Sequence, residues 1–163
     1  MIGYDEPMRT KPFVMGMSVL VFAGATLVLA QPKPVSSRIA ATVWKTPTCG
    51  CCSLWVDHLR ANGFQVDARD VSAAEVRAVS KAAGLSDNAT SCHTAKIGNY
   101  VVEGHVPAAD IHRMLKEKPA IAGIAAPGMP MGSPGMDQGG TREPYDVMAF
   151  TKGGQMTVFA KHK

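Results

Sequence analysis

After residue 38, apolar and polar positions alternate between strand-like and helix-like patterns along the chain. Residues 39–45 are apolar and rich in β-formers, which predicts a strand. Across residues 52–62, Trp55, Val56 and Leu59 recur at helical spacing, and a glycine follows directly, as is common just past a helix end. This region therefore predicts a strand followed by a helix.

The next segment repeats the same order. Residues 64–71 alternate apolar with polar positions, which predicts a second strand. Ser72 followed by Glu75 is a capping-box pattern, and it predicts a helix that ends at Gly84. The order strand, helix, strand, helix indicates an α/β layer with at least one parallel strand pair.

The second half of the chain is less regular. It predicts, in order, a polar loop, a hairpin, a helix, a long Gly-, Pro- and Met-rich loop, and two closing strands. These segments cover residues 86–94, 96–103, 108–116, 119–144, 146–150 and 156–160. No internal repeat is present in the sequence.

The start of the chain carries the pattern of a targeting segment. Arg9 and Lys11 precede an apolar run over residues 13–30, and Val28 and Ala30 fit the small-residue positions of a signal-peptide cleavage site. The run is also close to a membrane span of about 18 residues, so an uncleaved anchor is the alternative. In both cases the basic residues predict export of the remaining chain.

The chain is therefore expected to have three parts. A signal peptide or N-terminal membrane anchor comes first, a Pro-containing linker follows, and an α/β domain completes the chain. The boundaries are residues 1–30, 31–38 and 39–163, and the long loop of the domain covers residues 119–144. A membrane contact is expected only through the first part, if that part is not cleaved.

The charge of the chain excludes one class of partner. The sequence has 17 Lys and Arg against 13 Asp and Glu, which gives a formal net charge of +4. These charges are scattered, and no basic run is interleaved with aromatic residues. Since such a run is typical of nucleic-acid binding, no nucleic-acid partner is expected.

Four cysteines carry the candidate chemistry. Cys49, Cys51 and Cys52 crowd into four positions between the first strand and the first helix, and Cys92 lies in the later polar loop. The free N–H groups and the positive dipole end of a helix N-terminus stabilise thiolates. Gly50 lets the backbone turn tightly, so three sulfurs are expected to converge, with Cys92 closing the site.

Three chemistries compete at these cysteines. Crowded thiolates favour soft metals such as copper(I). The same segment contains a C-x-x-C, in which Cys49 would be the nucleophile and Cys52 the resolving thiol of a thiol–disulfide oxidoreductase. A pair of ordinary disulfides is the third alternative, although adjacent cysteines rarely bridge without strain. Structural zinc fits less well, because its ligands usually come as two separated pairs.

Methionines and histidines add candidate ligands. Met129, Met131 and Met136 lie in a Gly- and Pro-rich segment without core spacing, where thioethers suit copper(I) capture. Packing of this loop against the domain is the alternative. His93 directly follows a cysteine and is a further candidate. His58 and His105 are less favoured candidates. His112 and His162 are expected on the surface.

Four stretches of the chain occur in a specific order and spacing. They are Thr48-Cys49-Gly50-Cys51-Cys52 before Trp55, Ser91-Cys92-His93-Thr94, Tyr100-Val101-Val102-Glu103-Gly104-His105-Val106-Pro107-Ala108, and Pro127-Gly128-Met129-Pro130. Together these stretches resemble the CopG-like copper-resistance proteins of Gram-negative bacteria. The resemblance covers most of the domain that follows the linker.

The resemblance implies a fold, a location and a ligand set. It implies an α/β, thioredoxin-like domain with a central mixed β-sheet flanked by helices, in a periplasmic protein that serves copper resistance. It implies that Cys49, Cys51, Cys52 and Cys92 bind copper(I) in a thiolate cluster that can hold several ions and cycle between oxidation states. The expected partners are copper ions, other periplasmic copper-handling proteins and a copper exporter.

Overall fold

The structure is a computed structural model, and it describes residues 38–163 except 138 and 141. The predicted targeting segment and all but the last residue of the predicted linker lie outside the described residues. Within the described part of the chain, no helix is long and apolar enough to cross a membrane.

Eleven elements form the described part of the chain. They are β1 (Ile39–Lys45), α1 (Gly50–Ala61), β2 (Phe64–Asp70), α2 (Ala73–Ala82), the short 3-10 helix η1 (Asp87–Ala89), β3 (His93–Ile97), β4 (Tyr100–Gly104), α3 (Ala108–Glu117), β5 (Gly123–Ala126), β6 (Tyr145–Phe150) and β7 (Met156–His162). The predicted strands and helices of the first half are confirmed to within a few residues. The capping box of Ser72 and Glu75 is also confirmed.

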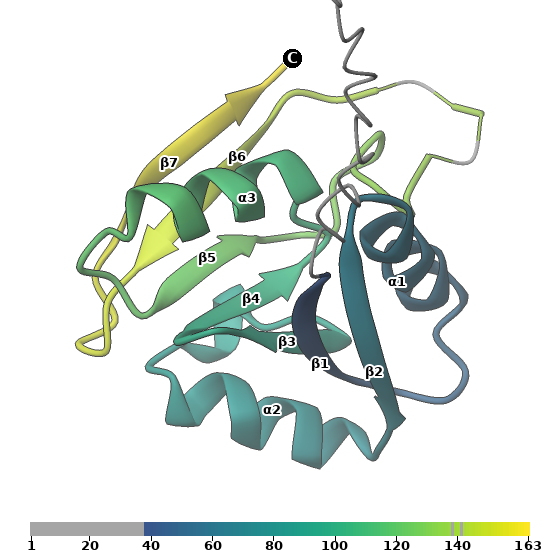
Figure 1. Cartoon of the computed structure of the whole chain (residues 1–163), viewed down its shortest axis with the longest axis horizontal. Coiled ribbons are helices and arrows are strands. Elements are labelled where there is room, and N and C mark those ends of the chain that lie inside the picture. The colour runs from purple at the N-terminus through teal and green to yellow at the C-terminus, as the bar shows by residue number, and fades with distance from the viewer. Residues whose placement is uncertain (1–37, 138, 141) are drawn as a thin grey trace, which may run out of the picture. The chain divides into compact units, whose positions relative to one another are not determined.

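The strands form a single seven-stranded mixed sheet in the order β2-β1-β3-β4-β5-β6-β7 (Figure 1). β1 pairs with β2 in parallel, and β4 pairs with β5 in parallel. The other four neighbouring pairs are antiparallel. The prediction of a mixed α/β sheet with at least one parallel pair is therefore confirmed.

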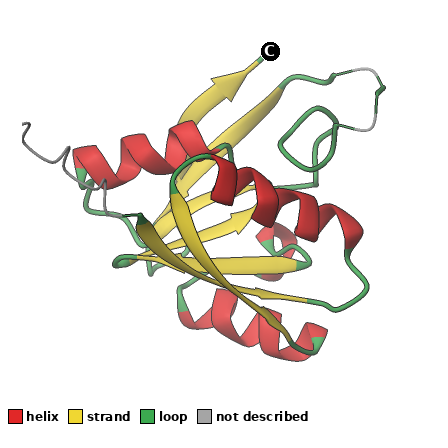
Figure 2. Ribbon diagram, turned by 45° about the vertical axis from the view of Figure 1, so that its right-hand side comes forward, coloured by secondary structure: helices red, strands yellow, loops and turns green. Residues whose placement is uncertain are grey.

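The helices cover the sheet on both faces, with α1 and α3 on one side and α2 on the other (Figure 2). The main core contains Trp55 and Leu59 of α1, Ile111 and Met114 of α3, and the inward-facing strand residues. In α1, the buried positions Cys52, Trp55, Val56 and Leu59 follow helical spacing, so one face of this helix is apolar and turned inward. Because Cys52 belongs to this face, its sulfur is directed into the domain.

The predicted long loop over residues 119–144 is wrong in one part. β5 lies within it, and all four of its residues are buried. A strand of four small or aliphatic residues with both faces covered shows no alternation, and the surrounding glycines and prolines hide it further. The predicted polar loop over residues 86–94 also ends earlier, because β3 already begins at His93.

Candidate metal centre

The sheet brings two distant segments together at one edge. β1 and β3 are antiparallel, and Lys45 at the end of β1 pairs with His93 at the start of β3. The backbone N–H of Thr46 donates to the carbonyl oxygen of Cys92 over 3.4 Å. The turn that follows β1 and the residue that precedes β3 are therefore neighbours, although they are more than 40 positions apart in the sequence.

The first helix places three of the cysteines. Cys49 is the N-cap of α1, and its Sγ accepts a hydrogen bond from the backbone N–H of Cys52 over 3.3 Å. This sulfur therefore satisfies one of the free N–H groups of the helix start, where negative charge is stabilised. Cys52 is fully buried, whereas Cys49, Cys51 and Cys92 are half-buried.

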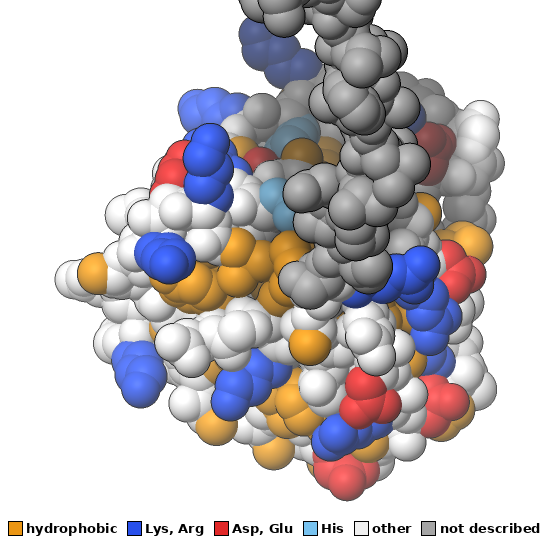
Figure 3. Space-filling model, viewed as in Figure 1, with side chains coloured by type: hydrophobic (Ala, Val, Ile, Leu, Met, Phe, Trp, Pro, Cys, Tyr) orange, Lys and Arg blue, Asp and Glu red, His pale blue; other side chains and the backbone are white. Residues whose placement is uncertain are grey.

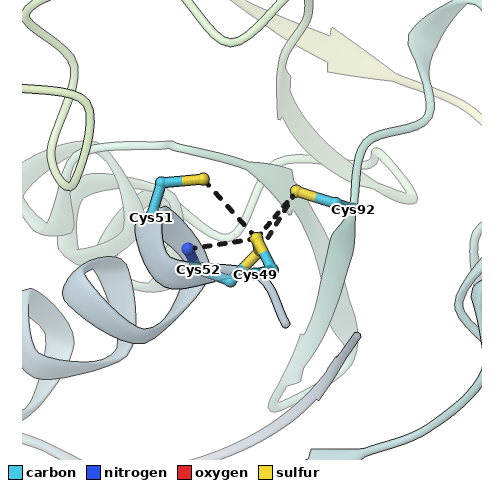
Figure 4. A group of neighbouring side chains, drawn as sticks. All are labelled: Cys49, Cys51, Cys52 and Cys92. Atoms are coloured by element: carbon cyan, nitrogen blue, oxygen red, sulfur yellow. Dashed lines mark hydrogen bonds between the residues drawn. A yellow bond between two sulfur atoms is a disulfide. The ribbon is translucent and has the colours of Figure 1, made fainter. Parts of the chain in front are cut away.

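The four sulfurs converge as the spacing predicted (Figure 4). Cys49 Sγ lies 3.5 Å from Cys51 Sγ and 3.2 Å from Cys92 Sγ. Cys52 Sγ lies 3.1 Å from Cys92 Sγ. Cys49 and Cys52 are joined in a disulfide, and Cys51 and Cys92 are free thiols. The structure thus shows the oxidised state of the C-x-x-C pair, with two thiols beside it.

One of the three candidate methionines reaches this group. β4 and β5 are parallel, so their C-terminal ends lie at the same end of the sheet. The loop after β5 places Met129 Sδ 3.9 Å from Cys92 Sγ. Met131 is exposed and Met136 is half-buried. Among the described residues, no contact joins the sulfur of Met131 or Met136 to a cysteine. In the described part of the chain, this loop therefore brings the sulfur of Met129 next to the cysteines, and Met131 and Met136 stay predicted ligands.

Two histidines lie directly behind the sulfurs. Ring nitrogens of His93 and His105 and the sulfur of Cys92 all lie within 4.8 Å of one another. Both histidines are fully buried. The His93 ring packs between Trp55, at 4.5 Å between centroids, and His105, at 4.8 Å. A nitrogen pair therefore adjoins the sulfur cluster on its inner side.

The surroundings keep both imidazoles neutral. Burial, together with the neighbouring His105, lowers the pKa of His93 to about 3. Burial also lowers the pKa of His105, which favours the neutral form of this ring too. Within the part of the chain that the structure describes, neither ring nitrogen of His93 has a hydrogen-bond partner, and neither has Nε2 of His105. Unpartnered buried polar atoms cost about 1–3 kcal/mol each, and they often mark the site of an ion or a ligand.

A buried carboxyl group supports the segment that carries Cys92. Glu103 on β4 is fully buried and accepts hydrogen bonds from the hydroxyls of Thr94, at 2.6 Å, and Ser80, at 2.9 Å, and from the backbone N–H of Ser91. Burial raises the pKa of Glu103 despite these bonds. The contact with Ser91 fixes the residue immediately before Cys92.

Cys92 itself is a weakly acidic thiol in this state. Burial and the neighbouring Cys51 raise its pKa to about 11. The thiol is therefore protonated at neutral pH, and any metal that binds its sulfur must displace a proton. A cavity of about 410 Å³ opens beside it, lined among others by Thr46, Arg77 and Met129, so the sulfur can be reached from solvent.

The structure also places the histidines that were given less weight. His58 accepts a hydrogen bond from the backbone N–H of Ala108 over 3.0 Å, and His112 is exposed, as expected. His162 pairs with Asp110 at 2.7 Å and is partly exposed at the surface. His105 lies within 4.8 Å of Cys92, and this approach depends on the β3–β4 register.

The fold and the site together define a class of protein. A thioredoxin-like α/β domain carries a compact sulfur cluster at the turn from its first strand to its first helix, with two imidazoles behind it. Residues 89–136 match a family described as "Protein of unknown function, DUF411". No curated protein matches the chain.

Two solved structures relate the chain to a protein of known name. "Copper resistance protein copG- Form 2" is 44 % identical with a TM-score of 0.70, and the match covers 77 % of this chain and 99 % of that chain. "Copper resistance protein copG- Form 1" is 42 % identical with a TM-score of 0.70, and the match covers 77 % and 98 %. The chain therefore belongs to the CopG copper-resistance family, and the family and the cysteine cluster support a copper-related function.

Proposed function

We propose that this protein binds copper(I) through Cys49, Cys51, Cys52 and Cys92, and that this binding protects the cell envelope from excess copper. One observation carries the proposal. Four sulfur atoms from two segments far apart in the sequence lie within 4.8 Å of one another at one edge of the sheet.

The chemistry of these ligands favours copper(I) over harder cations. Thiolate and thioether sulfurs are soft ligands that select copper(I), and the site offers four thiol sulfurs with the thioether of Met129 at its border. Sulfur atoms 3.1–3.5 Å apart are close enough to share metal ions, which supports a cluster of several copper ions. The two relatives described above are named as copper resistance proteins.

Loading of all four sulfurs requires reduction of the disulfide. The Cys49–Cys52 bond withholds two of the four sulfurs as thiolates. Two electrons and two protons from a thiol reductant convert it into two thiols, and copper then displaces protons from the thiols. We therefore expect copper(I) capacity to be high in the reduced protein and low in the oxidised protein.

Thiol–disulfide exchange is the other chemistry that the C-x-x-C would allow. The disulfide joins the pair that such an enzyme would use. The family membership does not favour this alternative, and Cys51 and Cys92, which a C-x-x-C enzyme does not need, lie against the same pair. Copper handling accounts for all four cysteines.

We also propose that the protein acts in the periplasm. The proposal is based on Arg9, Lys11 and the apolar run over residues 13–30. Other periplasmic copper-handling proteins and a copper exporter are the proposed protein partners. The N-terminal sequence of protein isolated from a periplasmic fraction tests the location, because cleavage after Ala30 leaves Gln31 as the first residue.

Copper(I) titration under anaerobic conditions tests the proposed function. Reduced wild-type protein should bind at least one copper(I) per chain in competition with a chromogenic chelator. Cys51→Ser and Cys92→Ser should each lower the stoichiometry or weaken the affinity by about tenfold or more, because each removes a sulfur from the cluster.

The matched control is the same protein with its Cys49–Cys52 disulfide intact, which differs only by two electrons and two protons. Its copper(I) capacity should be clearly lower. Less than one copper(I) per reduced chain would sink the proposal. An unchanged stoichiometry and affinity in Cys92→Ser would remove that residue from the ligand set.

A further inference from the structure

The cavity beside Cys92 is large enough to hold a small organic molecule. Its volume is about 410 Å³. A single water molecule takes about 30 Å³, and cavities of about 300–1,000 Å³ commonly hold small organic ligands. Since Cys92 lines the wall, a molecule bound in this cavity lies next to the sulfur cluster.

One helix and two loops form most of the wall. Ala73, Val76 and Arg77 have the helical spacing i, i+3 and i+4, so one face of α2 forms the first side. The loop before β3 forms the second side with Cys92, and the loop after β5 forms the third side with Met129. The cavity therefore has a cationic side chain on one side and sulfur-bearing side chains on the other two.

The charge of the cavity favours an anionic group. Arg77 is the charged residue of the lining, and in the described part of the chain no acidic side chain lines the cavity or forms an ion pair with Arg77. Glu75, two positions before it, accepts hydrogen bonds from the backbone N–H and the hydroxyl of Ser72 instead. The guanidinium is therefore available to a ligand, and its planar array of N–H donors matches a carboxylate.

The sulfur sides of the cavity favour a soft partner. The sulfurs of Cys92 and Met129 lie 3.9 Å apart, and both residues line the cavity. Cys92 Sγ also lies 3.2 Å from Cys49 Sγ and 3.1 Å from Cys52 Sγ, but neither of these two cysteines lines the cavity. A soft ion that arrives through the cavity therefore meets Cys92 before it meets these two sulfurs.

We propose that this cavity binds a small thiol that also has a carboxylate group, and that this thiol delivers copper(I) to Cys92. Thiolate sulfur is a soft ligand that holds copper(I), so a thiol is a suitable carrier for the ion. The carboxylate of the carrier pairs with Arg77, which places the carrier's sulfur on the side of Cys92 and Met129. The delivery step rests on the proposed function, whereas binding of the carrier in the cavity does not.

Delivery is a ligand exchange without a redox change. A bond forms between copper(I) and the sulfur of Cys92, and the bond between copper(I) and the carrier's sulfur breaks. The proton of the Cys92 thiol passes to the released thiolate, so the carrier leaves as a neutral thiol group. Copper stays in the +1 state throughout, and the step needs neither an oxidant nor a reductant.

A titration of the metal-free full chain with S-methylglutathione tests the binding site. This peptide keeps both carboxylates of glutathione, and its capped sulfur cannot exchange with the disulfide. Saturable shifts are expected for the backbone ¹⁵N signals of Thr90, Cys92 and Gly128, which line the cavity. Arg77→Gln should weaken binding by about threefold or more, because it removes an exposed charge pair. Arg60→Gln changes an exposed arginine in the last turn of α1 and, as the matched control, should bind like the wild type.

Two results of this titration would overturn the proposal. The first is a wild-type protein in which the signals of the cavity residues show no saturable shift. The second is an equal affinity in the wild type and Arg77→Gln, because the carboxylate would then not pair with the guanidinium. Arg77 is exposed, so its replacement tests binding without disturbing the core.

Copper(I) transfer rates separate delivery from the proposed function. Reduced protein is mixed anaerobically with copper(I) as its glutathione complex or as tetrakis(acetonitrile)copper(I), whose ligand has no carboxylate. Arg77→Gln should slow transfer from the glutathione complex by about threefold or more and leave transfer from the acetonitrile complex unchanged. Equal rates for wild type and Arg77→Gln with the glutathione complex, or equal slowing with both donors, would overturn delivery through the cavity. Failure of the wild type to take copper(I) from either donor would instead overturn the proposed function, and the metal-free titration would still decide whether the cavity binds the carrier.

Discussion

At the scale of single residues, the site depends on side chains that burial holds in one protonation state. His93 is fully shielded and packs against Trp55 and His105, with Cys92 beside it. Its pKa of about 3 means that the native protein resists protonation of this ring throughout the mildly acidic range. The imidazole therefore stays neutral, which is the form that binds metals.

The same shift predicts how the stability of the metal-free protein depends on pH. At pH 7 the His93 ring is mostly neutral in both folded and unfolded chains and contributes little to the dependence. Below about pH 6.5 the unfolded chain takes up a proton that the folded chain does not, so stability is lost as the pH falls towards 3. The folding equilibrium constant should then fall by up to about tenfold per pH unit from this residue.

Urea unfolding at pH 7, 6 and 5 measures this dependence. His93→Gln should make it shallower, because glutamine does not titrate. His112→Gln replaces an exposed histidine and should keep the wild-type slope. The burial of His105 acts in the same direction, so some dependence remains in His93→Gln. Equal slopes in the wild type and His93→Gln would contradict the prediction.

At the scale of elements, the loop between β5 and β6 folds back onto the start of α1. Gly135 has a φ of +85°, and a Cβ at this position would lie 2.7 Å from the carbonyl oxygen of Cys51 and 2.9 Å from the backbone nitrogen of Trp55. The neighbouring Pro134 accepts the hydrogen bond that orients His105. A glycine thus permits the close approach of the loop to the cysteine cluster.

Gly135→Ala should destabilise the protein and weaken copper binding together. The new methyl group combines left-handed backbone strain of about 1–2 kcal/mol with a clash against the backbone of α1. Gly63→Ala is the matched control, because Gly63 has a φ of +88° and no neighbour within 4 Å of an added Cβ. Urea unfolding and chelator competition should show a larger loss in both quantities for Gly135→Ala. Equal losses in the two variants would mean that the loop does not need this close contact.

The sequence could predict the elements that depend on local patterns. Helical spacing from Cys52 to Leu59 and the capping box at Ser72 predict α1 and α2, and both helices form there. β5 was missed because its identity depends on pairing with β4 and β6 and not on any local alternation. The position of Met129 next to Cys92 could not be predicted either, because it depends on where β5 ends.

The same distinction applies to the site. The crowded cysteines at the start of α1 and Cys92 as the fourth sulfur were both predicted from the sequence, and the sulfurs do converge. His105 could not be recognised in the same way, because it reaches Cys92 only through the β3–β4 pairing and the return of the Pro134 segment. Long-range register therefore sets the part of the site that the sequence alone does not reveal.

At the scale of the whole molecule, the candidate site at one end of the sheet is built from four segments of the chain. The turn after β1, the start of β3 and the loop after β5 supply the sulfurs, and the segment after β4 supplies His105. On the visible face, Lys and Arg side chains are interspersed with Asp and Glu (Figure 3). This face therefore carries charges of both signs.

This assembly predicts how copper should stabilise the fold. Cys49, Cys51 and Cys52 are close in sequence, so even the unfolded chain can gather copper(I) between them, and such binding adds no stability. Only the contact with Cys92, 40 positions away from Cys52, requires the folded sheet. For binding to the folded state alone, free copper at about 100 times Kd adds about 2.7 kcal/mol.

Thermal unfolding of the reduced protein with and without copper(I) tests this argument. For a domain of this size the wild-type Tm should rise by roughly 10 °C at that copper concentration, less any binding to the unfolded chain. Cys92→Ser should still bind copper(I) through the three neighbouring cysteines but should lose most of the increase in Tm. An equal increase in the Tm of Cys92→Ser would contradict the argument. The other three sulfurs would then bind copper(I) more tightly in the folded chain than in the unfolded chain without Cys92.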